Sequence, residues 1–234
     1  MMGFVREAVE AVGDDWATVE QFNEVLARLA HQRQASIAPN GIFLKSKLAW
    51  KIAAVQQAML YRIVMLADGC SSAWNARNIL TSILSARAIM ESAAVFLDFR
   101  TQLLRFTDAG NLDKIDALVI NRTFGTKPEG WLSADRAELA VNVQTMLAKL
   151  DKTIKGISGH YDRLSEICHP NYMGTYMMFA DLDTSNGVVT FSDKKLFTSG
   201  IFHHVFTAFL LIGLVENAAD AIDSLLPRIA DLQA

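Results

Sequence analysis

The ten residues from Tyr161 to Pro170 contain the side chains of this sequence that are best suited to chemistry. Arg163 and His169 are six positions apart, which on a helix separates them by roughly 120° around the axis and about 9 Å along it. The two side chains cannot touch at that spacing, but both can reach one ligand. A guanidinium can bind a phosphate while an imidazole takes or gives a proton, a combination suited to phosphodiester chemistry. Alternatively, Arg163 is a surface charge and His169 caps the following loop.

The residues around this pair predict an amphipathic helix with a polar edge. One face, at positions i, i+4 and i+7, carries Asp162, Glu166 and His169, with Ser165 beside them. The opposite face carries Tyr161, Leu164 and Cys168. Because Pro170 disfavours helical geometry in the preceding residue, His169 is predicted at the helix C-terminus, where the helix dipole favours a protonated imidazole.

Short segments of the chain resemble the HEPN superfamily. Arg163-Leu164-Ser165-Glu166-Ile167-Cys168-His169 is similar to the R-x(4–6)-H motif of that superfamily. Leu164-Ser165-Glu166 followed by His169-Pro170-Asn171 resembles an uncharacterised bacterial branch. On an earlier predicted helix, Ala86-Arg87-Ala88-Ile89-Met90-Glu91 is similar to the second recurring block of that branch. The resemblance covers about residues 75 to 170.

This resemblance implies a helical bundle that dimerises, often with the R-x-H segments of two protomers forming one cleft. Active members are metal-independent endoribonucleases of toxin-antitoxin and phage-defence systems, so it implies no cofactor, single-stranded RNA as a substrate, and an antitoxin or defence partner. By the same resemblance, Arg163 would stabilise charge on the scissile phosphate and His169 would act as general acid or base. The residues expected to support them are Asp162, Ser165, Glu166, Arg87 and Glu91.

Two other interpretations remain open. Leu164 stands where active members usually carry a polar residue, and many HEPN-like proteins are non-catalytic, so the chain is alternatively a helical dimerisation or interaction module. A third interpretation is a metalloenzyme, because Glu166 and His169 have the Glu-x-x-His spacing of carboxylate di-iron bundles, although the sequence has no second such motif. A mononuclear metal site would add Asp162 and His160 to these two residues.

Helical periodicity dominates the elements that must position these residues. Helices are predicted over residues 15–36, 42–67, 73–107, 111–122 and about 133–154, over the segment that ends at His169, and from about 195 to 227. Asp14 or Asp15 is the expected N-cap of the first helix. Arg87 and Glu91, four positions apart on the third, are predicted to form an ion pair at a helix seam or to orient Arg163 or His169 from behind.

The predicted exception to an all-helical chain is a β-hairpin near residues 177–191, with Asn186-Gly187 at its turn. The fold class is therefore mostly α, as an up-and-down bundle of about six to seven helices. A single domain is expected over residues 1–234. Its parts are the N-terminal helices at 1–70, a HEPN-like core at about 73–170, and the hairpin with the C-terminal helix at 171–234.

Composition restricts the function classes. Hydrophobic residues make up 51% of the chain and charged residues 20%, which favours burial of helix faces within the chain or against a second copy. The net charge of −3 provides no overall basic field, so RNA would need a local patch. No Gly-rich phosphate loop, Cys-x-x-Cys pair or nucleophile elbow occurs in the sequence. These absences argue against nucleotide-dependent, zinc-finger and α/β-hydrolase classes.

A cytoplasmic location without membrane insertion is expected. Residues 196–215 carry no Asp, Glu, Lys or Arg and are long enough to span a bilayer, but polar residues fill their first half, which favours a buried core helix. His203 and His204 in that run are expected to pack in a core or an interface. The N-terminus lacks the apolar core of a signal peptide. Cys70 and Cys168 lie in apolar helical stretches and are expected to be reduced and buried.

Overall fold

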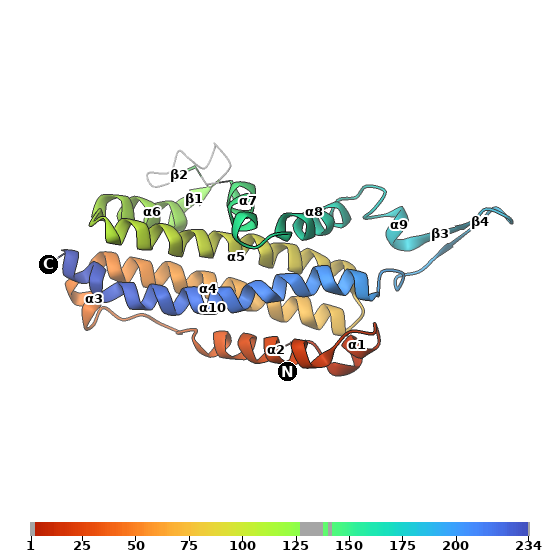
Figure 1. The fold of residues 1–234 in the computed structure, drawn as a ribbon, viewed down its shortest axis with the longest axis horizontal. Coiled ribbons are helices and arrows are strands. Elements are labelled where there is room, and N and C mark those ends of the chain that lie inside the picture. The colour runs from red at the N-terminus through yellow and green to blue at the C-terminus, as the bar shows by residue number, and fades with distance from the viewer. Residues whose placement is uncertain (1–2, 127–137, 140–141, 234) are drawn as a thin grey trace.

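Three long helices form the centre of the molecule. In the computed structural model, which describes residues 3–126, 138–139 and 142–233, α4 (Lys47–Asn75), α5 (Ile79–Asp108) and α10 (Ser199–Gln233) lie side by side (Figure 1). Their apolar faces meet in one core, which includes the fully buried side chains of Ile63, Trp74, Phe96, Phe99 and Phe209. The mostly α bundle predicted from the sequence is confirmed. Seven helices of the described chain have more than ten residues, which agrees with the six to seven expected.

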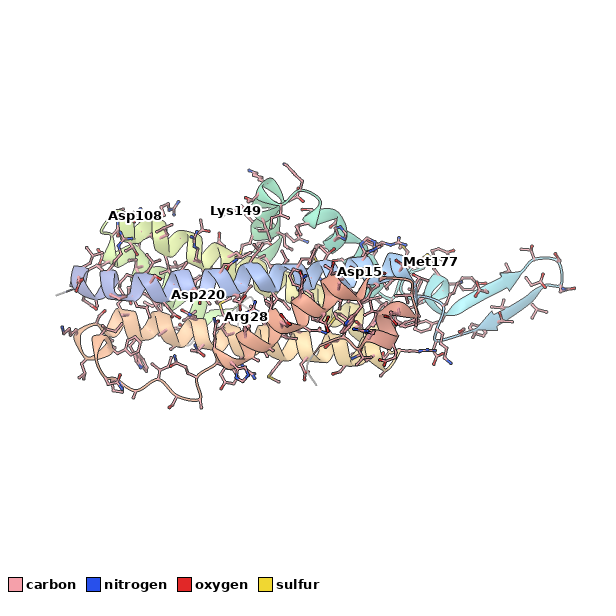
Figure 2. The ribbon with its side chains drawn as sticks, turned by 60° about the horizontal axis from the view of Figure 1, so that its bottom comes forward. Asp15, Arg28, Asp108, Lys149, Met177 and Asp220 are labelled. Atoms are coloured by element: carbon pink, nitrogen blue, oxygen red, sulfur yellow. The ribbon has the colours of Figure 1, made fainter. Side chains whose placement is uncertain are left out.

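A shorter helix, α2 (Trp16–His31), covers one side of this core, next to α1 (Arg6–Glu10). It begins as predicted, because the Asp15 side chain caps it by accepting hydrogen bonds from the backbone N–H groups of Ala17 and Thr18. It ends at His31, five residues before the predicted end. In Figure 2, α2 crosses in front of α10, and Arg28 forms an ion pair of 2.8 Å with Glu216 of that helix.

The boundaries of α4 and α5 differ from the prediction. Ser46 separates a short helix, α3 (Ile42–Lys45), from α4 and caps α4 with its hydroxyl. Asp68-Gly69 does not end α4, because burial of Cys70 and Trp74 in the following turn outweighs the weak helix propensity of one glycine. The helix ends instead at Asn75, before Arg77, whose φ of 60° breaks it, so α5 begins at Ile79 rather than at residue 73.

The last helix is also longer than predicted. α10 begins at Ser199 and continues through Pro227 to Gln233. A proline removes one backbone hydrogen bond from a helix, but Leu225, Leu226 and Ile229 beside it are buried and hold the final turns against the core. The predicted end at residue 227 is therefore wrong.

A second layer packs on α5 and consists of α6 (Leu112–Phe124), α7 (Val143–Thr153) and α8 (Ile157–Cys168) (Figure 1). The helix predicted over residues 111–122 corresponds to α6. Two-residue strands, β1 (Gly125–Thr126) and β2 (Glu138–Leu139), pair in parallel at the end of α6. The helix predicted over 133–154 is confirmed only from Val143 onward, and its expected start at Ser133 lies outside the described residues.

The predicted β-hairpin is present and projects from one end of the bundle (Figure 1). β3 (Ala180–Asp183) pairs antiparallel with β4 (Val188–Phe191), with Ala180 opposite Phe191, and Gly187 takes a φ of 64° in the turn. Residues 177–179 belong to a short helix, α9 (Tyr176–Phe179), at its base, where Figure 2 labels Met177.

Within the described part of the chain, two helices, α5 and α10, are long and apolar enough to cross a membrane by length and composition. In each, 56% of the most apolar window is buried inside the bundle, where α5 and α10 pack against each other and against α4. This burial fits the core helices of a soluble bundle.

Candidate functional site

The segment with Arg163 and His169 forms α8, which packs against α5 and α10. Its start is fixed by Gly156, whose φ of 95° suits glycine, and by Asp151, which accepts hydrogen bonds from the backbone N–H groups of Gly156 and Ser158 at 3.1 and 3.0 Å. These bonds hold the pKa of the Asp151 carboxyl below its usual range. The start of α8 is therefore anchored to the end of α7.

The amphipathic pattern predicted for α8 is confirmed. Asp162, Glu166 and His169 are exposed, and Tyr161 and Leu164 of the opposite face are buried. Cys168, also predicted on the buried face, is only half-buried, and Ile167 is buried in its place. Asp162 forms no side-chain hydrogen bond or ion pair with the described part of the chain. The Ser165 hydroxyl is buried without a hydrogen-bond partner there. Leu164, which follows Arg163, is 0% exposed and belongs to the core.

Arg163 is half-buried, and its guanidinium has no carboxylate partner among the described residues. Its Nη1 donates to the Met173 sulfur at 3.6 Å, and its other two nitrogens are open to solvent. A thioether is a weak acceptor, so this contact positions the guanidinium without neutralising it. The side chain remains available to an anion.

His169 lies at the C-terminal end of α8, as predicted, with φ −83° and ψ 145° before Pro170. Its side chain is exposed and forms no hydrogen bond with any described residue, including Arg163. Arg163 points to Met173 while His169 stays at the surface. One ligand would have to span both side chains for them to act together.

The loop after α8 is held by Asn171. Its side chain donates to Glu166 Oε2 at 2.9 Å and accepts from the backbone N–H groups of Met173 and Gly174. Gly174 packs so closely on the end of α8 that an added Cβ would lie 1.9 Å from the His169 carbonyl oxygen. Glu166 therefore supports the site indirectly, by fixing the loop that brings Met173 to Arg163.

Arg87 and Glu91 hold α8 from α5. They form the predicted ion pair, at 3.3 Å, and Tyr161 joins them, because its hydroxyl donates to Glu91 at 2.8 Å and accepts from Arg87 at 3.4 Å. The hydrogen bond to Tyr161 is the main reason why the pKa of Arg87 is raised. Burial raises the pKa of the half-buried Cys168 thiol nearby. The hydrogen bonds of Tyr161 to Arg87 and Glu91 lie on the buried face of α8. Arg87 and Glu91 therefore fix the helix and do not touch Arg163 or His169.

A group of histidines joins α8 to α10 next to Arg163. His160 Nδ1 lies 3.0 Å from His204 Nδ1 and 3.2 Å from the hydroxyl oxygen of Thr207. Burial is the main cause that lowers the pKa of both imidazoles, and Arg163 is close enough to lower that of His204 further. His203 faces elsewhere, and its Nε2 contacts Asp14 at 3.0 Å. Sequence reasoning treated His203 and His204 as packing residues.

The signal that could have revealed this group was its spacing. His160 and Arg163, like His204 and Thr207, are three positions apart, so each pair shares one face of its helix. The sequence could not show that these two faces meet. No group of three or more His, Cys, Asp or Glu side chains that could hold a metal ion occurs among the described residues, so their geometry lends no support to the metalloenzyme interpretation.

Comparison of the chain with protein-family models, with curated proteins and with solved structures finds no match.

Proposed function

We propose that the chain is a HEPN-like helical protein that acts on single-stranded RNA as a metal-independent endoribonuclease. The observation that carries the proposal is that Arg163 on α8 and His169 at the C-cap of α8 are both reachable from solvent and that neither is neutralised by a described carboxylate. Arg163 would bind the scissile phosphate and His169 would transfer a proton to or from the reacting oxygens. Hydrogen bonds fix helix α8 at its start through Asp151, on its buried face through Tyr161, and at its end through Asn171. These bonds would keep Arg163 and His169 in place.

Incubation of the purified protein with single-stranded RNA in EDTA tests the activity. The wild type should cleave, and Arg163→Ala and His169→Ala should each slow cleavage by at least about 100-fold, in line with the loss of a phosphate ligand or a general acid–base group. Matched controls are Arg228→Ala and His31→Ala, an arginine and a histidine on other helices, which should cleave at the wild-type rate. Equal cleavage by all variants, or none by the wild type, would refute the nuclease.

The proposal includes a homodimer in the cytoplasm, with an antitoxin or defence protein as partner. Dimerisation would bring two copies of α8, each with Arg163 and His169, to one cleft. Sedimentation equilibrium should give twice the chain mass of 25.8 kDa. A monomer at all concentrations would contradict this part of the proposal.

A second candidate, a non-catalytic interaction module, is favoured by two observations. Leu164 is a core residue where a polar one would be expected in an active member. The hairpin also exposes apolar side chains, with Leu182 52%, Val188 49% and Phe191 76% exposed, as binding surfaces often do. This candidate predicts that His169→Ala changes association or the melting temperature of a protein without RNA turnover.

A further inference from the structure

Arg163, His160 and His204 form a cluster of basic groups without a described acidic partner. Arg163 and His160 come from α8, and His204 comes from the first turns of α10, with Thr207 beside it. Of the carboxylates near the cluster, Asp14 contacts His203 and Ser199, and Glu166 accepts from Asn171. Asp162, next to Arg163 on α8, is exposed and forms no ion pair with a described residue. On α5, Glu91 is paired with Arg87 and Tyr161 on the buried face of α8. None of these carboxylates is bonded to Arg163.

The hydrogen-bond distances fit one arrangement of protons on the two imidazoles. When the Thr207 hydroxyl donates to the His203 carbonyl, at 2.7 Å, its oxygen accepts from His160. His160 therefore carries its proton on Nδ1 and donates it to Thr207 and to His204 Nδ1. His204, which accepts on Nδ1, must carry its own proton on Nε2.

This arrangement leaves complementary groups free. Both Nε2 atoms form no hydrogen bond within the described chain and are open to solvent. His204 Nε2–H is a donor, and His160 Nε2 is a base that can bind a proton. Together with the two free nitrogens of Arg163, they provide donors and one proton acceptor around a site with no described acidic side chain bonded in it.

We propose that Arg163, His160 and His204 form a binding site for a phosphoryl group at the junction of α8 and α10. A guanidinium binds phosphate oxygens through paired N–H donors, His204 Nε2–H donates to a further oxygen, and His160 Nε2 accepts from a protonated phosphate oxygen. The phosphoryl group comes either from a small phosphate compound or from a nucleic acid backbone. Under the proposed function it is a phosphate of the RNA, and this assignment to RNA is the one step that rests on that function.

Imidazole NMR of the full chain in phosphate-free buffer tests the site. Inorganic phosphate, added at constant ionic strength, should shift the ring resonances of His160 and His204 saturably and leave those of His31 on α2 unchanged. Arg163→Gln should weaken phosphate affinity at least tenfold, since hydrogen bonds to a charged group are worth about 1.5–3 kcal/mol and each 1.4 kcal/mol is about a factor of ten. Arg163→Lys, which keeps the charge, should recover part of the affinity.

The matched control is Arg228→Gln, which removes an arginine of α10 about 36 Å along the helix from His204. It should bind phosphate like the wild type. No saturable shift in the folded wild type, an equal shift with acetate, or unchanged affinity in Arg163→Gln would each overturn the site.

A short single-stranded RNA distinguishes the two sources of the phosphoryl group. If RNA and phosphate compete in shifting the His204 ring resonance, the site binds the nucleic acid backbone. If phosphate binds without competition from RNA, the site binds a small phosphate compound. Both outcomes support the site. Phosphate binding in a protein that does not cleave RNA refutes the proposed nuclease alone. Arg163-dependent cleavage without any phosphate or RNA response of His160 and His204 refutes this site alone.

Discussion

Arg163 and His204 are 41 positions apart in the sequence, yet the tertiary fold makes the charge of one affect the other. Partial burial is the main cause that lowers the pKa of His204, and the nearby positive groups, His160, Arg163 and His203, add to it. For His160 the causes are burial and then His203. Both imidazoles are therefore kept neutral in the folded protein at pH values where an unfolded chain binds protons.

A lowered imidazole pKa makes the fold sensitive to acid. The stability that the neutral His160 and His204 imidazoles contribute is fully present above the unfolded pKa of about 6.5. It is lost as the pH falls through their lower folded pKa, because the unfolded chain binds more protons there. We expect His204→Asn to reduce the loss of stability between pH 7.5 and pH 5, because the Asn amide can still accept from His160 but cannot be protonated.

Urea denaturation at the two pH values, in phosphate-free buffer, measures this change. His31→Asn, at an exposed position of α2, should keep the wild-type pH dependence. An identical pH dependence in His204→Asn and the wild type would show that this imidazole does not titrate differently in the folded state.

Two glycines at helix α8 occupy different kinds of position. Gly174 lies outside the helix, pressed against its last carbonyl groups, whereas an added Cβ at Gly159 inside the helix meets nothing within 4 Å. We expect Gly174→Ala to cost about 1–3 kcal/mol, as overpacking does. Gly159→Ala should stabilise by about 0.5–1 kcal/mol, because alanine loses less conformational freedom in a helix.

The free energies of unfolding of the two variants, measured in urea, provide the comparison. Equal effects of the two alanines would mean that the end of α8 is not closely packed. If the nuclease proposal holds, Gly174→Ala should also slow RNA cleavage, since displacement of this loop moves Met173 away from Arg163.

A buried ion pair joins the second layer of the molecule to the core. Arg122 of α6 donates to Asp98 of α5 at 2.8 Å, with only 6% and 9% of their side chains exposed, and Lys149 of α7 reaches the same carboxylate at 3.3 Å. Figure 2 shows Lys149 on the layer above α5. A surface pair of similar length, Arg228 with Asp108 at 2.9 Å, has both side chains more than half exposed and serves as the control.

We expect Arg122→Met to destabilise the whole protein by about 3 kcal/mol, the lower end for a broken buried pair, because Lys149 still reaches Asp98. Arg228→Met should change stability by about 1 kcal/mol or less, as surface pairs do. Thermal or urea unfolding followed by circular dichroism measures both. Similar losses in the two variants would contradict the role of burial.

Element types followed largely from the sequence. The start of α2, the position of α6 and the hairpin around Asn186-Gly187 were predicted correctly, because capping side chains, helical periodicity and turn residues act locally. The helix boundaries near Gly69, Arg77 and Pro227 were predicted wrongly. At Gly69 and Pro227, burial of neighbouring apolar residues in the core overrode the local preference to end the helix.

The sequence alone determined that Arg163 lies on an amphipathic helix that His169 ends, just before Pro170, since periodicity and a proline are local properties. It also determined that Arg87 and Glu91 pair, because they are one helical turn apart. Only the tertiary structure decided that the face of α8 with His160 and Arg163 meets His204, and that Arg87 and Glu91 reach Tyr161. Those contacts depend on which helix faces pack together, and that is set by burial of the whole core rather than by any segment.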